Sequence, residues 1–414
     1  MESVSLPASA ELFSLLRADS PLLWWRRGDG MVGIGELETL SFSGKSRIAD
    51  AGAAWREVSA AAQVTDAVSV AGSGLIAFGT FAFRSTSAVP SVLIIPKLVV
   101  GHRAGTSWLT RISYADDEVA PLTHASASEL LAEHLNSNEK LGSAPLVPLS
   151  PASLSEEGFT SAVNKAIERI NAGEVEKVVL ARELEGTLPT GSDLRVAITR
   201  LAESYPDCWT FSVDGLFGSS PETLITVHGK KVTARVLAGT AKRGSDNASD
   251  LAQAAELASS NKDLDEHGFA TRSVLNALTP YAQQLSVSDA PFTLKLPNVW
   301  HLATDIAGTL AQGSNSLDLV SALHPTAAVA GTPTAVAVEV IDDLEPFDRG
   351  RYAGPVGWIG ADGDGEWAIA LRCAQLTGST VTAYAGCGIV SDSVAAQELV
   401  ETDMKFRPII DALS

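Results

Sequence analysis

The stretch RGRYAGPVGW (349–358), followed by GEWAIALR (365–372) and YAGCGIV (384–390), consists of apolar strand segments interrupted by Gly, Arg and Glu. HPTAAVAGTP (324–333) precedes it and ELVETDMK (398–405) follows it. A charge buried in such strands must be paired or must bind something, because an isolated charge is costly to remove from water. The density of charge at strand ends and on one helix face predicts a site for a small, highly charged ligand.

Outward from this stretch, helical and strand patterns alternate. Phe159, Val163 and Ile167 recur at helical spacing, and Gly173 suits the end of that helix. The patterns predict helices over 156–173, 247–283, 314–323, 333–343 and 393–413, a strand over 176–184, a hairpin over 224–239 around His228-Gly229, and three strands within 352–390. Strands in hairpins with helices between them indicate an α+β fold with large antiparallel sheets.

The N-terminal part has a different residue pattern. Residues 64–115 are rich in Val, Ile, Phe, Thr and turn signals, which predicts several antiparallel strands, and 125–136 predicts a short helix. The Pro- and Ser-rich stretch KLGSAPLVPLSPASLSEEG (140–158) has no periodicity and marks the best boundary. We therefore expect a β-rich part over 1–145 and a second region over 155–410, joined in one fold.

Composition excludes several classes of partner. The chain has 414 residues, of which 45% are hydrophobic, so it can bury a large core. Its formal net charge of −19 argues against nucleic acid or an anionic membrane as a partner. An anionic substrate must therefore find a local cationic pocket.

The chain also carries cues to its compartment. Cys208, Cys373 and Cys387 have no disulfide or metal spacing, which fits a reducing cytoplasm. We expect no signal peptide, and the longest uncharged run, 67–83, is shorter than the roughly 20 residues of a membrane helix. Without a coiled coil or an evident interface segment, a monomer is the default expectation.

Two residues at strand starts are candidates for acid–base chemistry. Lys177 begins the apolar strand EKVVLAREL, where a lysine whose pKa is lowered can act as a general base. Glu222, in GSSPETLI (218–225), precedes a strand, where burial can make it a proton donor. From spacing alone, a solvent-directed lysine and a turn-capping glutamate are the better explanations.

A metal site is predicted from two helices. Glu398, Glu401 and Lys405 share one helix face, and Glu266 lies on the helix predicted over 247–283. Two glutamates without His or Cys companions suit Mg²⁺, which accepts one or two carboxylates and keeps waters. An ordinary Glu-to-Lys surface pair and a helix-capping role for Asp263 with Glu266 are the structural alternatives.

Cationic and glycine positions complete the candidate pocket. Arg372 ends an alternating strand, EWAIALR, and Gly386 flanks Cys387; a guanidinium beside exposed backbone N–H groups binds carboxylates well. Lys405 adds a second cation. Gly239 and Thr240, in a loop that closes the 224–239 hairpin, offer close backbone approach and a hydroxyl, although the spacing is not that of a phosphate loop.

Together these motifs resemble the chorismate-binding enzymes over about residues 155–410, and within that family the isochorismate synthases. The resemblance implies two-layered antiparallel sheets with helices outside. Lysine at position 177 is typical of members that add water, whereas members that add ammonia carry glutamine there. Ala238 stands where aminodeoxychorismate synthases carry an attacking lysine. Salicylate synthases, which go on to eliminate pyruvate, and a non-catalytic relative are the alternatives.

The resemblance also implies roles. Lys177 would activate water, Glu222 would protonate the departing hydroxyl, and Glu266 with Glu401 would hold Mg²⁺. The substrate chorismate would contact Gly239, Thr240, Arg372, Gly386, Lys405, His324 and Tyr352, and His301 would have a structural or orienting role. Ala327, Ser219 and Cys387 depart from the family pattern without removing a proposed catalytic group. The sequence leaves open whether the product feeds menaquinone, a siderophore or salicylate.

Overall fold

The computed structural model describes residues 1–7, 11–244, 246–295 and 299–414, without the side chains of Thr240, Lys262, Glu266 and Val299. Its strands pair almost entirely antiparallel, apart from a short parallel pairing of β1 with β4. The strands are β1 (Glu2–Leu6), β2 (Leu22–Arg26), β3 (Asp29–Phe42), β4 (Thr65–Asp66), β5 (Ile76–Thr80), β6 (Ser91–Arg103), β7 (Thr106–Arg111), β8 (Ser150–Pro151), β9 (Lys177–Thr187), β10 (Trp209–Val213), β11 (Leu216–Ser220), β12 (Thr223–His228), β13 (Lys231–Lys242), β14 (Ala282–Val287), β15 (Phe292–Lys295), β16 (Val299–Leu310), β17 (Gly331–Thr332), β18 (Pro355–Gly360), β19 (Gly365–Ile369), β20 (Cys373–Thr377) and β21 (Thr380–Ile389).

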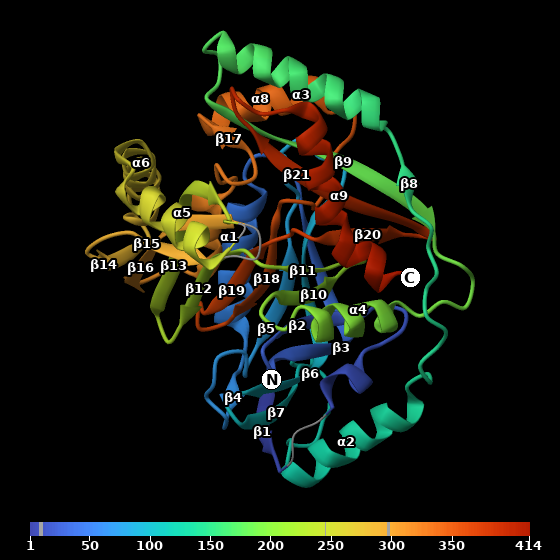
Figure 1. Cartoon of the computed structure of the whole chain (residues 1–414). Coiled ribbons are helices and arrows are strands. Elements are labelled where there is room, and N and C mark those ends of the chain that lie inside the picture. The colour runs from blue at the N-terminus through green and yellow to red at the C-terminus, as the bar shows by residue number, and fades with distance from the viewer. Residues whose placement is uncertain (8–10, 245, 296–298) are drawn as a thin grey trace.

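The helices pack against the outside of these strands, as the α+β prediction requires. They are η1 (Leu12–Leu15), α1 (Arg47–Ala61), α2 (His124–Ser137), α3 (Glu156–Asn171), α4 (Leu194–Ser204), α5 (Asn247–Ser259), α6 (Asn261–Leu278), α7 (Ser316–Leu323), α8 (Thr334–Leu344) and α9 (Ala395–Ala412). Figure 1 shows α3, α8 and α9 at the end of the molecule where β9 and β21 lie, and α5 and α6 beside β13 to β16 at one side.

The N-terminal and C-terminal parts of the chain share hydrogen-bonded strands. β5 pairs with β18, so that Phe78 lies opposite Trp358, and β2 pairs with β10, so that Trp24 lies opposite Phe211. All four side chains are buried. The proposed division at 140–158 therefore separates segments that contribute strands to the same sheet.

A carboxylate is buried where these two parts meet. Glu366 on β19 accepts hydrogen bonds from the indoles of Trp24 (2.8 Å) and Trp358 (2.9 Å) and from the Arg103 guanidinium (2.9 and 3.0 Å), and His228 Nε2 lies 2.9 Å away. Burial raises the pKa of Glu366, but the neighbouring His228 and Arg103 outweigh it and hold the pKa far below its usual range. Glu366 is therefore ionised and joins β2, β6, β12 and β18.

The predicted helix over 247–283 is wrong in its extent. The structure has two helices, α5 and α6, and then strand β14. The Ser260 hydroxyl accepts a hydrogen bond from the Asp263 N–H, which starts a new helix one residue after α5 ends. Because Ser also occurs within helices, the sequence pattern did not mark this break.

Three further predictions need correction. The region 352–390 holds four strands, β18 to β21, and not three. The segment LAGTAKRG is not a loop that closes the hairpin, because β13 continues through it to Lys242 with a register shift between Leu237 and Thr240. β19 is buried throughout and ends at Ile369, so Arg372 does not end an alternating strand. Strands covered on both faces lose the alternation that a half-exposed strand displays.

The remaining predicted elements agree with the structure to within a few residues. The helix expected over 156–173 is α3, with its end near Gly173, and the strand expected over 176–184 is β9. None of the helices in the described ranges is long and apolar enough to cross a membrane.

Candidate active site

Lys177 is the first residue of β9, which lies between β17 and β21. On the β21 side, Gly388 leaves room for the lysine side chain, because a Cβ added there would lie 2.8 Å from Lys177 Cε. The lysine therefore lies across a glycine of β21. Sequence spacing alone favoured a solvent-directed lysine, and the structure instead places this side chain against the sheet.

Glu222 lies between β11 and β12, and its backbone fixes its position. Its N–H bonds to the Ser220 hydroxyl (3.2 Å), and its carbonyl accepts from the Ile369 N–H (3.1 Å). Burial raises the pKa of the Glu222 carboxyl, against the opposing effect of nearby cations: Lys177, Lys405 and Arg372. The structure thus brings Glu222 together with three of the other predicted site residues.

Arg372 lies between β19 and β20 in a left-handed conformation, with φ of 48°. Burial lowers the pKa of its guanidinium, and Tyr352 and Glu401 are among the groups whose charge acts on it. Within the described part of the chain, no group accepts a hydrogen bond from Arg372, although the structure gives such bonds to many other arginines. Its donors remain available for a ligand carboxylate.

Gly386 presents its backbone to the same place. It lies opposite Ala181 on β9, and the Ala181 N–H bonds to Glu345 on the far edge of β9. The pair is therefore non-hydrogen-bonded, and the Gly386 N–H and C=O point away from β9. β20 no longer covers this edge, because its pairing with β21 reaches only to Tyr384. The predicted Gly386 N–H donor is thus directed beyond the end of β20.

Lys405 and Glu401 lie on α9 and form an ion pair of 2.6 Å. Lys405 Nζ also donates to the Gly386 carbonyl (2.7 Å), so this lysine faces the sheet and not bulk solvent. Arg182 on β9 holds the same helix through Thr402 (2.7 Å) and Asp403. The alternative of an ordinary surface pair is therefore incomplete, because one member is also bound to β21.

The second predicted metal ligand is on α6. The side chain of Glu266 lies outside the described residues, as does that of Thr240, so neither prediction is examined by the structure. The next residue, His267, is buried and bonds the Ala238 carbonyl (3.0 Å) and the Thr304 hydroxyl (2.6 Å). These bonds fix this turn of α6 against β13 and β16.

Gly239 lies beside that turn. Its φ is +80°, and an added Cβ would approach Asp263 Cβ to 3.3 Å, so a side chain would be strained and crowded. His301 is close by: burial lowers its pKa, a hydrogen bond to the Gly239 backbone opposes this, and Lys177 and Lys405 add to the lowering. Gly239 and His301 therefore belong to the same neighbourhood as Lys177.

Tyr352 is buried, and its ring stacks on Tyr384 at 5.2 Å. A Cβ added to Gly386 would lie 3.0 Å from the Tyr352 hydroxyl, which places that hydroxyl beside the part of β21 that β20 does not cover. Burial raises the pKa of Tyr352, so the phenol is neutral and can donate a hydrogen bond.

His324 has a different environment from the other predicted residues. Its Nε2 atom pairs with the Phe83 carbonyl at 3.1 Å, and its ring lies edge-on to Phe83. Burial lowers its pKa to about 3, and the nearby Arg47 adds to the effect, so the imidazole is neutral. The described contacts join His324 to Phe83, in the segment between β5 and β6, and not to Lys177 or Glu222, which favours a structural role over substrate contact.

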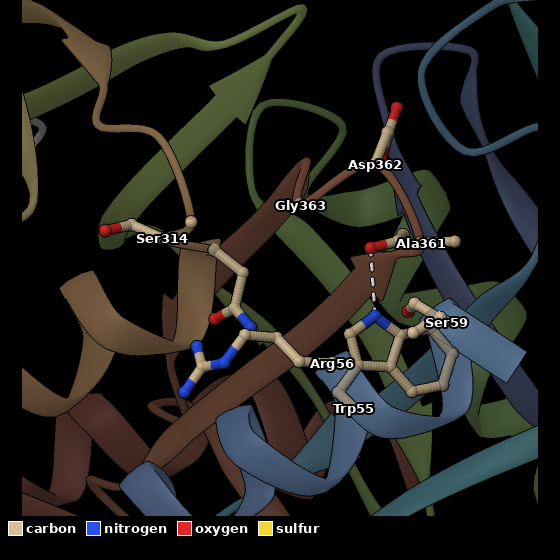
Figure 2. A pocket seen from close by; sticks show the side chains of 11 residues that line it. Trp55, Arg56, Ser59, Ser314, Ala361, Asp362 and Gly363 are labelled. Atoms are coloured by element: carbon tan, nitrogen blue, oxygen red, sulfur yellow. Dashed lines mark hydrogen bonds between the residues drawn. The ribbon is translucent and has the colours of Figure 1, made fainter.

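Two cavities lie among the described residues. Figure 2 shows one of about 310 Å³ between α1 and the loops after β16 and β18, lined by Trp55, Asn315 and Asp362 among others. The Trp55 indole donates to the Gly360 carbonyl (2.9 Å) beneath it. A second cavity, of about 270 Å³, lies between α5, α6 and Ala241, next to Asp263. Among the described side chains, which do not include those of Thr240 and Glu266, no predicted site residue lines either cavity.

Sequence reasoning missed the buried charges that support the site. Arg182, Glu345 and Arg349 are buried, and each bonds to a segment far away in the chain. Arg349 stands in the first stretch quoted above, but its partner in β9 lies 170 residues away. Arg349 lies in the loop between α8 and β18, and nothing in the sequence indicates its partner in β9.

Comparison with known proteins supports this description. A family model for chorismate binding enzymes matches residues 11–414. Isochorismate synthase DhbC of Bacillus subtilis is 39% identical over 269 residues, which cover 62% of this chain and 68% of that protein. Isochorismate synthase MenF of the same organism is 36% identical over 264 residues, covering 63% of this chain and 56% of that protein.

Two solved structures are similar to this chain over nearly its whole length. A Bacillus anthracis structure, provisionally described as the 2,3-dihydroxybenzoate-specific isochorismate synthase DhbC, has a TM-score of 0.73 at 30% identity, covering 97% of this chain and 98% of that one. The menaquinone-specific isochorismate synthase MenF of Escherichia coli has a TM-score of 0.76 at 24% identity, covering 100% of this chain and 94% of that one, and attests the fold. The chain belongs to the chorismate-binding enzyme family, which confirms the resemblance predicted from the sequence.

Proposed function

We propose that this protein is an isochorismate synthase, which converts chorismate to isochorismate by adding water at C2 and releasing the C4 hydroxyl. The observation that carries the proposal is the raised pKa of Glu222 in the presence of three cationic side chains, Lys177, Lys405 and Arg372. A buried carboxyl whose pKa is raised, beside a lysine and a carboxylate receptor, matches the needs of this reaction. The names of the relatives from Bacillus subtilis support the same activity.

The substrate would be held by charge. Chorismate carries two carboxylates, and the guanidinium of Arg372 has donors without a described protein acceptor. The outward N–H of Gly386 and the hydroxyl of Tyr352 lie at the same end of β21. These groups would bind one carboxylate. Because the chain carries a net charge of −19, this local cationic cluster is what makes the pocket attractive to a dianion.

A divalent metal, which we propose to be Mg²⁺, would bind the other carboxylate. Glu401 is a half-buried carboxylate on the helix face directed toward Gly386, and oxygen ligands suit a hard cation. Glu266 is the proposed second ligand. When bound, the ion would draw electron density from the ring toward the carboxylate. The fit rests on Glu401 alone, since the Glu266 side chain lies outside the described residues.

The proton transfers would fall to the chain's own residues. Lys177, in its neutral form, would take a proton from the attacking water. Glu222, in its protonated form, would give a proton to the C4 hydroxyl, which leaves as water. One proton is accepted and one is donated in each turnover, so the overall reaction is an isomerisation.

A salicylate synthase is the second candidate, because it takes the same first step and then eliminates pyruvate. Incubating the purified protein with chorismate and Mg²⁺ and separating the products distinguishes the two activities. Isochorismate without pyruvate supports the proposal, whereas stoichiometric pyruvate and salicylate would support the alternative. Unchanged chorismate would indicate a non-catalytic relative.

Further proposals concern the compartment, the oligomeric state and the pathway of the enzyme. We propose a cytoplasmic monomer that acts on a small molecule and feeds menaquinone or siderophore synthesis. The relatives named above carry both kinds of designation, menaquinone-specific MenF and 2,3-dihydroxybenzoate-specific DhbC, so the comparisons do not separate the two pathways. The genes that neighbour this one would separate them.

A further inference from the structure

Strand β9, which begins with Lys177, has an unusual outer edge. One edge pairs with β21 along its whole length, from Val178 to Thr187. On the other edge, β17 covers only Lys177 and Val178, and β8 covers only Leu184 and Glu185. Backbone hydrogen bonds extend these pairings to the Val179 N–H, which donates to the Ala330 carbonyl, and to the Glu183 carbonyl, which accepts from the Ala152 N–H. Among the described residues, no strand lies beside the edge between these two bonds.

Two side chains fill this gap. The Glu345 carboxylate accepts a hydrogen bond from the Ala181 N–H (2.8 Å), and the Arg349 guanidinium donates to the Val179 carbonyl (2.7 Å). Val179 and Ala181 are alternate residues, so both groups point to the same edge, where a neighbouring strand would otherwise bond them. Glu345 and Arg349 thus supply an acceptor and a donor in place of a strand backbone.

The two side chains are also bonded to each other. Arg349 Nε lies 2.8 Å from one oxygen of Glu345 and Nη2 lies 2.6 Å from the other, an arrangement in which the guanidinium binds bidentately. The side chains are 0% and 1% exposed. Replacing such a pair with apolar groups is often neutral for stability, so stability alone does not explain why the chain carries it.

Arg349 also reaches the rest of the site. Its third nitrogen donates to the Val329 carbonyl (2.9 Å), in the segment that leads into β17. Its guanidinium lies over the rings of Phe83 (4.6 Å) and Tyr352 (5.9 Å). Arg349 therefore contacts β9, which carries Lys177. It also contacts the segment that leads into β17 and the ring of Tyr352.

We propose that Glu345 and Arg349 are positioning residues, which hold β9 by acting as a surrogate strand and thereby place Lys177 and Tyr352 for the reaction. The inference rests on the proposed function insofar as it takes Lys177 as the base. Neither residue is catalytic, because Glu345 acts through the backbone of β9 and Arg349 acts through that backbone and the Tyr352 ring.

The test is a variant that removes the pair without leaving an unpaired charge, Glu345→Leu with Arg349→Met. A matched control is Asp193→Asn with Arg195→Met. That pair is 5% exposed on each side, and Arg195 likewise donates to backbone carbonyls, those of Leu16, Glu139 and Lys140. The pair lies at the start of α4, and none of its described hydrogen bonds reaches β9.

The first readout is amide hydrogen exchange resolved to single residues in the intact chain. In the Glu345→Leu/Arg349→Met variant, the Ala181 amide should exchange about five- to tenfold faster, because its acceptor is gone. The Leu180 amide, which belongs to the alternate set facing β21, should change little. Equal protection of Ala181 in the variant and the wild type would overturn the surrogate strand. This readout does not depend on chorismate turnover.

The second readout is steady-state kinetics with chorismate. The variant should lose about ten- to a hundredfold in kcat, with KM changed less than about threefold, because small misplacement of a reacting group has effects of that size. The control variant should keep its kcat at a comparable melting temperature. If both variants lose activity in proportion to stability, the positioning role is wrong. A wild-type protein that does not convert chorismate would contradict the proposed function, and the exchange result would then decide the surrogate strand by itself.

Discussion

Lys405 Nζ lies 2.6 Å from the carboxylate of Glu401, so the residue proposed to hold a metal ion is already paired with a cation one helical turn away. The same nitrogen donates to the Gly386 carbonyl, which holds the lysine against the sheet. A divalent cation must therefore compete with Lys405 for Glu401, or share the carboxylate with it through its second oxygen. This relationship makes the metal dependence of the protein directly testable.

Removing Glu401 should separate metal binding from folding. Glu401→Gln should abolish the heat of Mg²⁺ binding in calorimetry and reduce turnover to near background. Its unfolding free energy should change by less than about 1 kcal/mol, because the side chain is 45% exposed and pairs of this kind are weak. Asp411→Asn, which breaks another exposed pair on the same helix, is the control. Wild-type turnover in EDTA would count against the two-carboxylate site.

The proposed base has its own test. Lys177→Gln should lose isochorismate formation while it keeps chorismate binding, because Arg372 and the metal site are unchanged. Binding is measured by equilibrium dialysis and turnover by product chromatography. Lys231→Gln, at an exposed lysine that begins β13, provides a control. Isochorismate formation at the wild-type rate by Lys177→Gln would remove this lysine from the mechanism.

The proposed acid predicts a loss of rate and a change in its pH dependence. Glu222→Gln cannot transfer a proton, so kcat should fall by about two to four powers of ten with little change in KM. In the wild type, kcat should decline as pH rises through the raised pKa of Glu222, because only the protonated carboxyl can donate. A sharp rise in KM with kcat unchanged would make Glu222 a binding residue.

The same pKa has a consequence for stability. A carboxyl whose pKa is higher in the folded protein binds protons more tightly in that state, so its contribution to stability is present at low pH and declines as pH rises through the folded pKa. Glu222→Gln should therefore melt at the same temperature as the wild type, or a higher one, at neutral pH. Thermal unfolding followed by circular dichroism measures this. A markedly lower melting temperature would support the turn-capping explanation instead.

Glu366 should make stability depend on pH in the opposite direction to Glu222. The pKa of Glu366 is lower in the folded protein than in the unfolded chain, so its ionised form stabilises the fold at neutral pH. This stabilisation begins to be lost when pH falls below the unfolded pKa, and it disappears as pH falls through the folded pKa. Glu366→Gln should destabilise the protein by about 3–5 kcal/mol at pH 7, because Arg103 is left with an unpaired buried charge. Urea unfolding at pH 7 and pH 4 should display a smaller difference at the lower pH. An equal difference at both pH values would contradict the ionised state.

The sequence predicted the parts of the molecule that local patterns determine. The start of β9 at Lys177, the position of Glu222 before β12 and the helix that carries Glu401 all follow from hydrophobic periodicity and short motifs. The break at Ser260 was missed, because helix-capping serines and helix-interior serines are alike in a single sequence.

Other features could not be predicted because they depend on contacts between distant segments. Arg349 bonds to Val179, and Glu366 bonds to Trp24, across more than 150 residues in each case. No spacing rule connects such positions. Gly239 was predicted to lie in a loop, but it lies within β13 with a positive φ, and the Ala238 carbonyl beside it bonds to His267 of α6, a later segment. Buried charge in strands was the general signal, and its partners required the structure.

The central claim is that the chain adds solvent water to chorismate. Turnover of chorismate with Mg²⁺ in water enriched in ¹⁸O, followed by mass spectrometry of the product, tests it directly. If solvent water is added at C2, isochorismate should carry one ¹⁸O in its new hydroxyl group, and no pyruvate should be released. Unlabelled isochorismate, pyruvate formed in step with chorismate loss, or unchanged chorismate would contradict it.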